Sequence, residues 1–179
     1  AAHRLNRYPD REFIDLRSDL AGYLLRESGV ALRPEQVWAA NGSNEVMLHL
    51  LQAFGGPGRT AVSFAPTYSM YPEYARDTAT GWVVGRRAED FTVDPAHAAE
   101  LLAEHRPSVV LLASPNNPTG TALPAGTVRA VLAAADEVPG GCVVVVDEAY
   151  AEFRRAGVPS ALELLAEYPT LAVTRTMSK

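Results

Sequence analysis

The only lysine of the sequence, Lys179, lies in a segment that also carries hydroxyl groups. It follows Thr176 and Ser178 in the segment TRTMSK, and the other 15 basic residues are arginines. A lysine amine can form a Schiff base with an aldehyde. A lone lysine is more often a solvated surface charge, so Lys179 is a candidate nucleophile only if its surroundings supply the rest of a site.

The segment NGSNE is a second candidate, because it opens an amphipathic helical pattern over residues 41–54. Gly42 permits a ligand to approach the backbone closely, and Ser43 and Asn44 offer N–H groups and side chains at the positive end of the helix dipole. These features suit a phosphate group. Capping of the helix by Ser43 or Asn44 also explains the segment, and for the segment in isolation that interpretation is favoured.

Asp147 follows four valines, so a carboxylate is predicted at the end of a buried strand. Burial raises the pKa of such a carboxyl unless a cation pairs with it. The pattern is also found in P-loop nucleotide hydrolases, but these need a G-x-x-x-x-G-K-[ST] loop, and no lysine precedes residue 179. A dinucleotide-binding fingerprint is excluded because GGPG follows a helical pattern and lacks the third glycine.

Two further loops carry an amide and an aromatic ring. Asn117, in SPNNPTG, would be a rigidly held hydrogen-bond donor, although a tight turn explains the same composition. Tyr68, Tyr71 and Tyr74 have the spacing of a helix face, and Tyr68 at the loop end is free to stack on a ring. The four histidines lack metal-ligand spacing, so no metal site is predicted, and Glu148 is expected to have a structural role.

The segments between these loops alternate between extended and helical patterns. Continuous Val and Leu runs predict strands that are covered on both faces, and their alternation with helices predicts an α/β fold. The expected architecture is a mainly parallel, doubly wound sheet with helices on both faces, whose candidate loops lie beyond the carboxyl ends of the strands. The predicted strands are 37–40, 60–64, 81–85, 108–114, 142–148 and 171–176. The predicted helices are 11–28, 41–54, a helix after the loop that starts at residue 65, 94–105, 124–137 and 160–167.

The composition is that of an ordinary globular protein, with 47% hydrophobic and 21% charged residues. A net charge of −5 argues against nucleic acid as a partner. The longest apolar runs are too short to span a bilayer and no signal peptide is recognised, so no membrane association is predicted and a cytoplasmic location is expected. Cys142 is expected to be a small core residue.

Six motifs together resemble the fold type I pyridoxal-phosphate (PLP) aminotransferases. They are, in chain order, LNRYPD, NGSNE, PTYSMY, SPNNPTG, VVVDEAY and TRTMSK, and they extend from residue 5 to residue 179. Thirty residues separate Asn117 from Asp147, and 32 separate Asp147 from Lys179, which matches the spacing of that family. Each motif alone is weak evidence for the resemblance, whereas all six in this order are strong evidence.

The resemblance implies a role for each matching residue. Lys179 would bind PLP as a Schiff base and later shuttle a proton, and Asp147 would keep the pyridine nitrogen protonated, which makes the ring a better electron sink. Asn117 and Tyr150 would hydrogen-bond the 3-hydroxyl group, and Tyr68 would stack on the ring. The residues expected at the cofactor phosphate are Gly42, Ser43, Asn44, Thr176 and Ser178.

The resemblance also implies that active sites are shared in a homodimer, since Tyr8 matches a tyrosine that reaches the phosphate of the neighbouring subunit. The chain starts without methionine and stops where a strand enters a loop. We therefore expect residues 1–179 to be part of a large PLP-binding domain, without the amino-terminal arm, the last sheet strand and the carboxy-terminal small domain. Such a piece is expected to be inactive alone.

Within the family, PTYSMY and DEAYAEF favour the branch that transfers an amino group between L-histidinol phosphate and 2-oxoglutarate in histidine biosynthesis. The small-molecule partners would then be an amino donor and a 2-oxo acid. An aminotransferase for aromatic amino acids and a decarboxylase of threonine phosphate remain alternatives. A non-catalytic binding module of the same fold is a further alternative, which the presence of Asn117, Asp147, Tyr150 and Lys179 disfavours.

Overall fold

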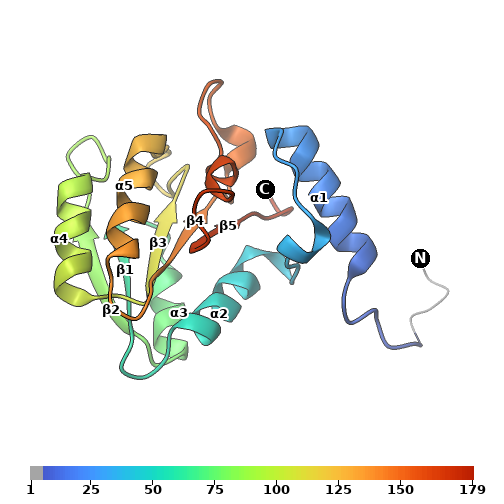
Figure 1. The fold of residues 1–179 in the computed structure, drawn as a ribbon, viewed down its shortest axis with the longest axis horizontal. Coiled ribbons are helices and arrows are strands. Elements are labelled where there is room, and N and C mark those ends of the chain that lie inside the picture. The colour runs from blue at the N-terminus through green and yellow to red at the C-terminus, as the bar shows by residue number, and fades with distance from the viewer. Residues whose placement is uncertain (1–5) are drawn as a thin grey trace. The chain divides into compact units, whose positions relative to one another are not determined.

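The aliphatic runs of the sequence form a five-stranded parallel sheet with the strand order β2-β1-β3-β4-β5 in the computed structural model (Figure 1). The model describes residues 6–179. The strands are β1 (Thr60–Ala65), β2 (Gly81–Arg86), β3 (Val109–Ala113), β4 (Val143–Asp147) and β5 (Leu171–Thr174). Each end lies within one residue of its predicted position, apart from the end of β5, which was predicted two residues too late.

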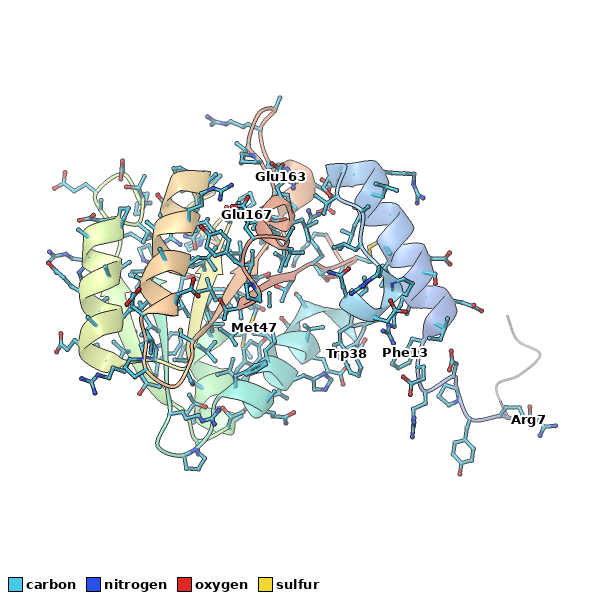
Figure 2. All side chains as sticks on the ribbon, viewed as in Figure 1. Arg7, Phe13, Trp38, Met47, Glu163 and Glu167 are labelled. Carbon is cyan, nitrogen blue, oxygen red and sulfur yellow. The ribbon has the colours of Figure 1, made fainter. Side chains whose placement is uncertain are left out.

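Both faces of the sheet are covered by helices, which explains why its strands are apolar without alternation. In β3, Val110 and Leu112 pack in a cluster with residues of α4 (Pro95–His105) and α5 (Ala125–Asp136). Val109 and Leu111 pack on the opposite face with residues of α2 (Gly42–Phe54) and α3 (Tyr71–Asp77), including the buried Met47 (Figure 2). The predicted doubly wound α/β architecture is therefore confirmed.

The direction in which strands are added to the sheet reverses at β1. The crossover through α3 places β2 on one side of β1, and the crossover through α4 places β3 on the other side. The carboxyl ends of parallel strands meet at one edge, and a ligand crevice forms where the strand order reverses. The loops after β1, β3, β4 and β5 therefore share the edge at which a site is expected.

Tertiary contacts replace one predicted helix with shorter turns. Residues 160–167 form a single 3-10 turn, η4 (Ala161–Leu164), and another turn, η3 (Ala151–Phe153), follows β4. The Ser160 hydroxyl and the Ala161 amide both donate to the buried carboxylate of Glu148. This contact fixes the start of the segment in a conformation that local sequence could not indicate. In contrast, α4 begins as predicted, with Asp94 accepting from the Ala96 amide at 3.0 Å.

The remaining described residues form a separate unit that ends at Ala40. It contains α1 (Ile14–Ser28), predicted as 11–28, and the turn η2 (Pro34–Gln36), which accepts a hydrogen bond from Arg17 at Pro34 O. The rings of Phe13 and Trp38 meet edge to face (Figure 2). The predicted strand at 37–40 is wrong, because no described strand pairs with this segment. Among residues 6–179, no helix is long and apolar enough to span a membrane.

Candidate active site

Asp147 ends β4 at the carboxyl edge of the sheet, in register with Ala113 of β3 and Thr174 of β5. Its carboxylate is buried and accepts two hydroxyl hydrogen bonds of 2.9 Å, from Thr174 at Oδ1 and from Tyr71 at Oδ2. The Ala149 amide donates to Oδ1 at 3.2 Å. Burial raises the pKa of Asp147 and these hydrogen bonds oppose the rise, as expected for a carboxylate that has no paired cation among the described residues.

The start of α2 offers backbone N–H groups that no side chain caps. The helix begins at Gly42, and the preceding Asn41 makes no side-chain capping bond. The amide of Asn41 is already taken by Glu45 at 2.5 Å. Because Ser43 and Asn44 lie inside the first turn, the interpretation of either residue as the cap is wrong. The first N–H groups of a helix have no partner within the helix, so those of α2 are available to an anion.

Thr176 brings hydroxyl groups to this helix start. Gly42 has a φ of +76°, and a Cβ at this position would lie 3.8 Å from Thr176 Oγ1. The hydroxyls of Thr176 and Ser178 are 2.9 Å apart. The structure thus brings Gly42 next to Thr176 and Ser178, residues far apart in sequence that were predicted to share one phosphate site.

Tyr68 connects the helix start with the environment of Asp147. Its hydroxyl donates to Asn44 Oδ1 at 3.3 Å, and its ring lies edge to face with that of Tyr71, with 5.6 Å between the centroids. Tyr71 in turn donates to Asp147. A further tyrosine of α3, Tyr74, is buried, and its hydroxyl has no hydrogen-bond partner in the part of the chain that the structure describes.

Lys179 lies in the segment after β5, and Tyr150 lies in the segment after the neighbouring strand β4. The Lys179 Nζ is 5.4 Å from the centroid of the Tyr150 ring. Tyr150 is half-buried and follows Asp147 by three residues, directly before η3. The exposed lysine is therefore close to the segment that carries the buried carboxylate, as a shared site requires.

Asn117 is half-buried in the loop after β3, next to a residue that the sequence did not single out. That residue, Asn116, is buried and donates through Nδ2 to Pro66 O at 3.1 Å and to Thr119 Oγ1 at 2.8 Å. Tyr8 is fully exposed and belongs to the separate unit that ends at Ala40. Its predicted role therefore stays a prediction.

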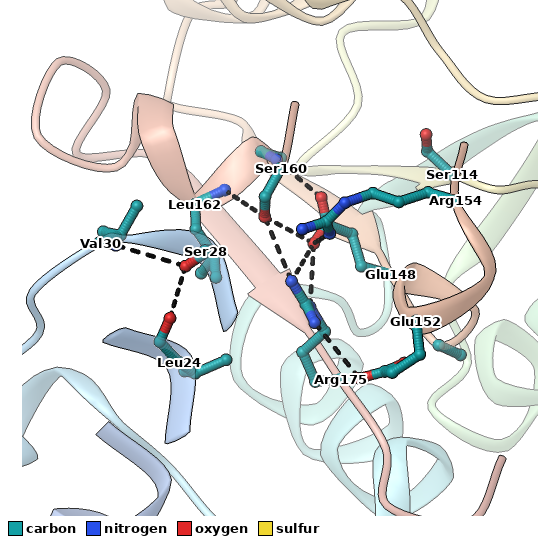
Figure 3. A network of polar contacts seen from close by, with 12 residues as sticks. Leu24, Ser28, Val30, Ser114, Glu148, Glu152, Arg154, Ser160, Leu162 and Arg175 are labelled. Atoms are coloured by element: carbon teal, nitrogen blue, oxygen red, sulfur yellow. Dashed lines mark hydrogen bonds and ion pairs between the residues drawn. The ribbon is translucent and has the colours of Figure 1, made fainter. Parts of the chain in front are cut away.

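Glu148 has the structural role that the sequence predicted for it (Figure 3). Its buried carboxylate accepts from Ser160 Oγ at 2.7 Å, from the Ala161 amide at 2.6 Å and from Arg175 Nε at 2.9 Å. Successive strand residues point to opposite faces, so Asp147 and Glu148 diverge. The same alternation places Thr174 and Arg175 on opposite faces. The contact between Glu148 and Arg175 therefore lies on the face opposite Asp147 and joins the ends of β4 and β5.

The residues that sequence reasoning missed are those that orient others. Tyr71 and Thr174 were not predicted to contact Asp147, although the alternation along β4 and β5 indicates that Thr174 shares its face. Arg87 was also missed, since an arginine after a strand carries no motif. It is buried beside Asn116, to which its Nη2 donates at 3.0 Å.

The chain is similar to known proteins over its whole length. The family described as aminotransferase class I and II matches residues 1–179. The chain is 60% identical to a histidinol-phosphate aminotransferase of Frankia casuarinae, covering all of this chain and 45% of the relative. It is 57% identical to that of Bifidobacterium longum, covering 99% of this chain and 48% of the relative.

A solved structure shows the same fold. The histidinol-phosphate aminotransferase from Sinorhizobium meliloti, crystallised in complex with pyridoxal-5'-phosphate, superposes with a TM-score of 0.80 at 25% identity. The match covers all of this chain and 46% of that one. The chain thus spans about half the length of the curated relatives it matches. On the match of the family to all 179 residues, the chain belongs to the class I and II aminotransferases.

Proposed function

We propose that the protein containing this chain is a PLP-dependent aminotransferase that acts on L-histidinol phosphate and 2-oxoglutarate. The names of the 57–60% identical relatives support this substrate pair. The single observation that carries the proposal is the grouping of a buried carboxylate, an uncapped helix start and one lysine at the carboxyl edge of the sheet.

The residues present fit PLP, which carries a phosphate, a ring nitrogen and an aldehyde. The uncapped start of α2, with the hydroxyls of Thr176 and Ser178, suits the phosphate. Asp147 is buried with a raised pKa, and Oδ2 accepts one hydrogen bond from the described residues, so it can accept another from a protonated ring nitrogen. Lys179 provides the amine for the aldehyde. The full set proposed to hold the group is Gly42, Ser43, Asn44, Tyr68, Asn117, Asp147, Tyr150, Thr176, Ser178 and Lys179.

Each residue would then act on a stated atom. Bound PLP supplies an electron sink for the carbanion at the substrate's alpha carbon. Asp147 would keep the ring nitrogen protonated. Its buried carboxylate has no cationic partner among the described residues, and the positive charge of the protonated nitrogen would stabilise it. The free amine of Lys179 would carry the proton from the substrate's alpha carbon to the carbon C4′ of the cofactor. Asn117 and Tyr150 would hydrogen-bond the 3-hydroxyl, and the ring of Tyr68 would cover one face and exclude water.

The proposal extends to assembly and location. A homodimer with Tyr8 reaching the phosphate of the neighbouring subunit would complete each site, and a cytoplasmic location suits an enzyme of amino-acid synthesis. Residues 1–179 would be part of the large PLP-binding domain, with the amino-terminal arm, the last strand and the small domain supplied by the rest of the protein. We expect a purified 1–179 chain to show no transamination.

Substrate choice can be tested on the full-length protein with PLP. We expect amino transfer from L-histidinol phosphate to 2-oxoglutarate, with kcat/KM at least about 100-fold above that for phenylalanine, because sites that bind a polar group reject analogues without it. Preference for phenylalanine would favour an aminotransferase for aromatic amino acids. Release of CO2 from threonine phosphate would favour the decarboxylase alternative, and absence of all three reactions would contradict the proposal.

A further inference from the structure

Arg87 is a buried arginine that contacts three segments at the carboxyl edge of the sheet. It follows β2 and is 8% exposed. Its Nε donates to Phe64 O at 3.1 Å, its Nη1 to Phe91 O at 2.9 Å and its Nη2 to Asn116 Oδ1 at 3.0 Å. No carboxylate among the described residues forms an ion pair with it, so its charge is solvated by fixed carbonyl and amide dipoles.

Asn116, which accepts from Arg87, also forms hydrogen bonds with two loops. Its Nδ2 donates to Pro66 O in the loop after β1 and to Thr119 Oγ1 in the loop after β3. Its backbone closes the second loop, because its carbonyl accepts from Gly120 N at 2.7 Å and its amide donates to Thr121 O at 2.9 Å. Arg87 and Asn116 together connect the ends of β1, β2 and β3.

The two loops that meet at Asn116 carry two of the proposed cofactor contacts. Tyr68 lies two residues beyond Pro66, and Asn117 directly follows Asn116. We propose that Arg87 is a positioning residue, which acts through Asn116 to set the Tyr68 ring and the Asn117 amide at the distance that a flat ligand requires. The roles of Tyr68 and Asn117 rest on the proposed function, whereas the restraint of the two loops does not.

The presence of an arginine at position 87 supports a role in positioning the two loops, rather than a role in the stability of the fold alone. A buried cation loses its hydration, so an apolar side chain would fill the same space at lower cost. Burial also lowers the pKa of Arg87. An arginine presents several N–H groups in a fixed planar fork, which can bind three acceptors in defined directions, whereas a lysine has one flexible donor group. A geometric requirement explains why such a side chain lies here.

The restraint can be measured in the full-length apoprotein, without any reference to activity. Arg87→Lys keeps the charge and loses the fork, and Asn116→Ala breaks the link to both loops. We expect hydrogen exchange in segments 65–70 and 114–121 to become about 10-fold faster in each variant, with the rest of the sheet unchanged, because each loses hydrogen bonds made by a charged or buried group. Arg86→Met, at the exposed neighbouring arginine, is the matched control and should leave both segments unchanged.

The consequence for the cofactor is measured by PLP binding to the same proteins. We expect the Kd of PLP to rise about 10-fold in Arg87→Lys and in Asn116→Ala, and the pH midpoint of the visible absorption of bound PLP to shift. The double variant should resemble Asn116→Ala alone, since the two residues act in series. If one variant does not fold, Thr119→Val removes the next hydrogen bond of the series and should give a smaller change of the same kind.

The outcomes separate this inference from the proposed function. Faster exchange in both loops with a weaker, spectrally shifted PLP complex supports it. Unchanged exchange in both loops, or an equal increase throughout the chain, overturns it. If the wild-type protein does not bind PLP while the loops are released by the variants, the proposed function fails and the restraint by Arg87 stands.

Discussion

Tyr71→Phe removes one hydroxyl from the candidate site and keeps the ring that packs against the sheet. The lost group donates to Asp147 Oδ2 at 2.9 Å in a buried environment. A hydrogen bond to a charged group contributes about 1.5–3 kcal/mol and a neutral one about 0.5–1.5 kcal/mol. We therefore expect the free energy of unfolding of the apoprotein to fall by about 1.5–3 kcal/mol where Asp147 is ionised, and by less where it is protonated.

The same change should weaken cofactor binding. The hydrogen bond from Tyr71 lowers the pKa of Asp147 against the effect of burial, so its loss raises that pKa further. A carboxyl that is harder to ionise stabilises a protonated ring nitrogen less well. A loss of about 1.4 kcal/mol corresponds to a 10-fold higher Kd for PLP, and we expect an effect of this order.

Urea unfolding of the apoprotein at two pH values and titration with PLP measure both effects. Tyr74→Phe is the matched control, because Tyr74 lies on the same helix, is also buried and has no hydrogen-bond partner for its hydroxyl among the described residues. We expect Tyr74→Phe to be neutral or stabilising. Equal losses in the two variants, or a Tyr71→Phe protein with unchanged Kd, would refute the assignment of Tyr71 as the partner of Asp147.

Three further perturbations have defined outcomes. Gly42→Ala should cost about 1–2 kcal/mol because its φ is +76°, and should weaken PLP binding, whereas Gly126→Ala in a helix with open space around it should stabilise by up to about 1 kcal/mol in the same thermal and titration assays. Because burial raises the pKa of Asp147, folding takes up a proton, so the contribution of Asp147 to apoprotein stability is greatest below the unfolded pKa and is lost as pH rises through the folded pKa. In Asp147→Asn, the free energy of unfolding by urea should no longer show this fall with rising pH. The affinity for PLP should also decrease. Glu148→Gln should cost about 1.5–3 kcal/mol in urea unfolding, since it removes the buried charge that accepts from Arg175 Nε at 2.9 Å, and the same change at Glu152, whose side chain is 34% exposed, should cost under about 1 kcal/mol.

The strands were predictable because their environment leaves a direct pattern in the sequence. Val109–Ala113 and Val143–Asp147 are buried on both faces, and an uninterrupted aliphatic run is the consequence. The segment 37–40 is also apolar, yet a strand needs a hydrogen-bonded neighbour as well, which composition cannot report. Residues 160–167 form only a short turn because a carboxylate from β4 captures their first amide and hydroxyl.

The candidate site was predictable where one residue type is required and unpredictable where geometry decides. Lys179 and Asp147 stand out because an amine and a buried carboxylate are rare in their surroundings. Tyr71 and Arg87 have no such signal, since their partners are 76 and 29 residues away in sequence and meet only after the strands have paired. Asn116 and Asn117 are adjacent and chemically identical, so only the fold distinguishes the buried residue from the half-buried one.

The most direct test of the central claim is covalent mapping of the cofactor on the full-length protein. The protein is incubated with PLP, reduced with borohydride, digested and examined by mass spectrometry. Lys179 is the only lysine within these 179 residues, so an adduct in this part of the chain is assigned without ambiguity. We predict a phosphopyridoxyl group on Lys179, which disappears in Lys179→Arg. A folded protein with no adduct at Lys179 would contradict the assignment of this edge of the sheet as a PLP site.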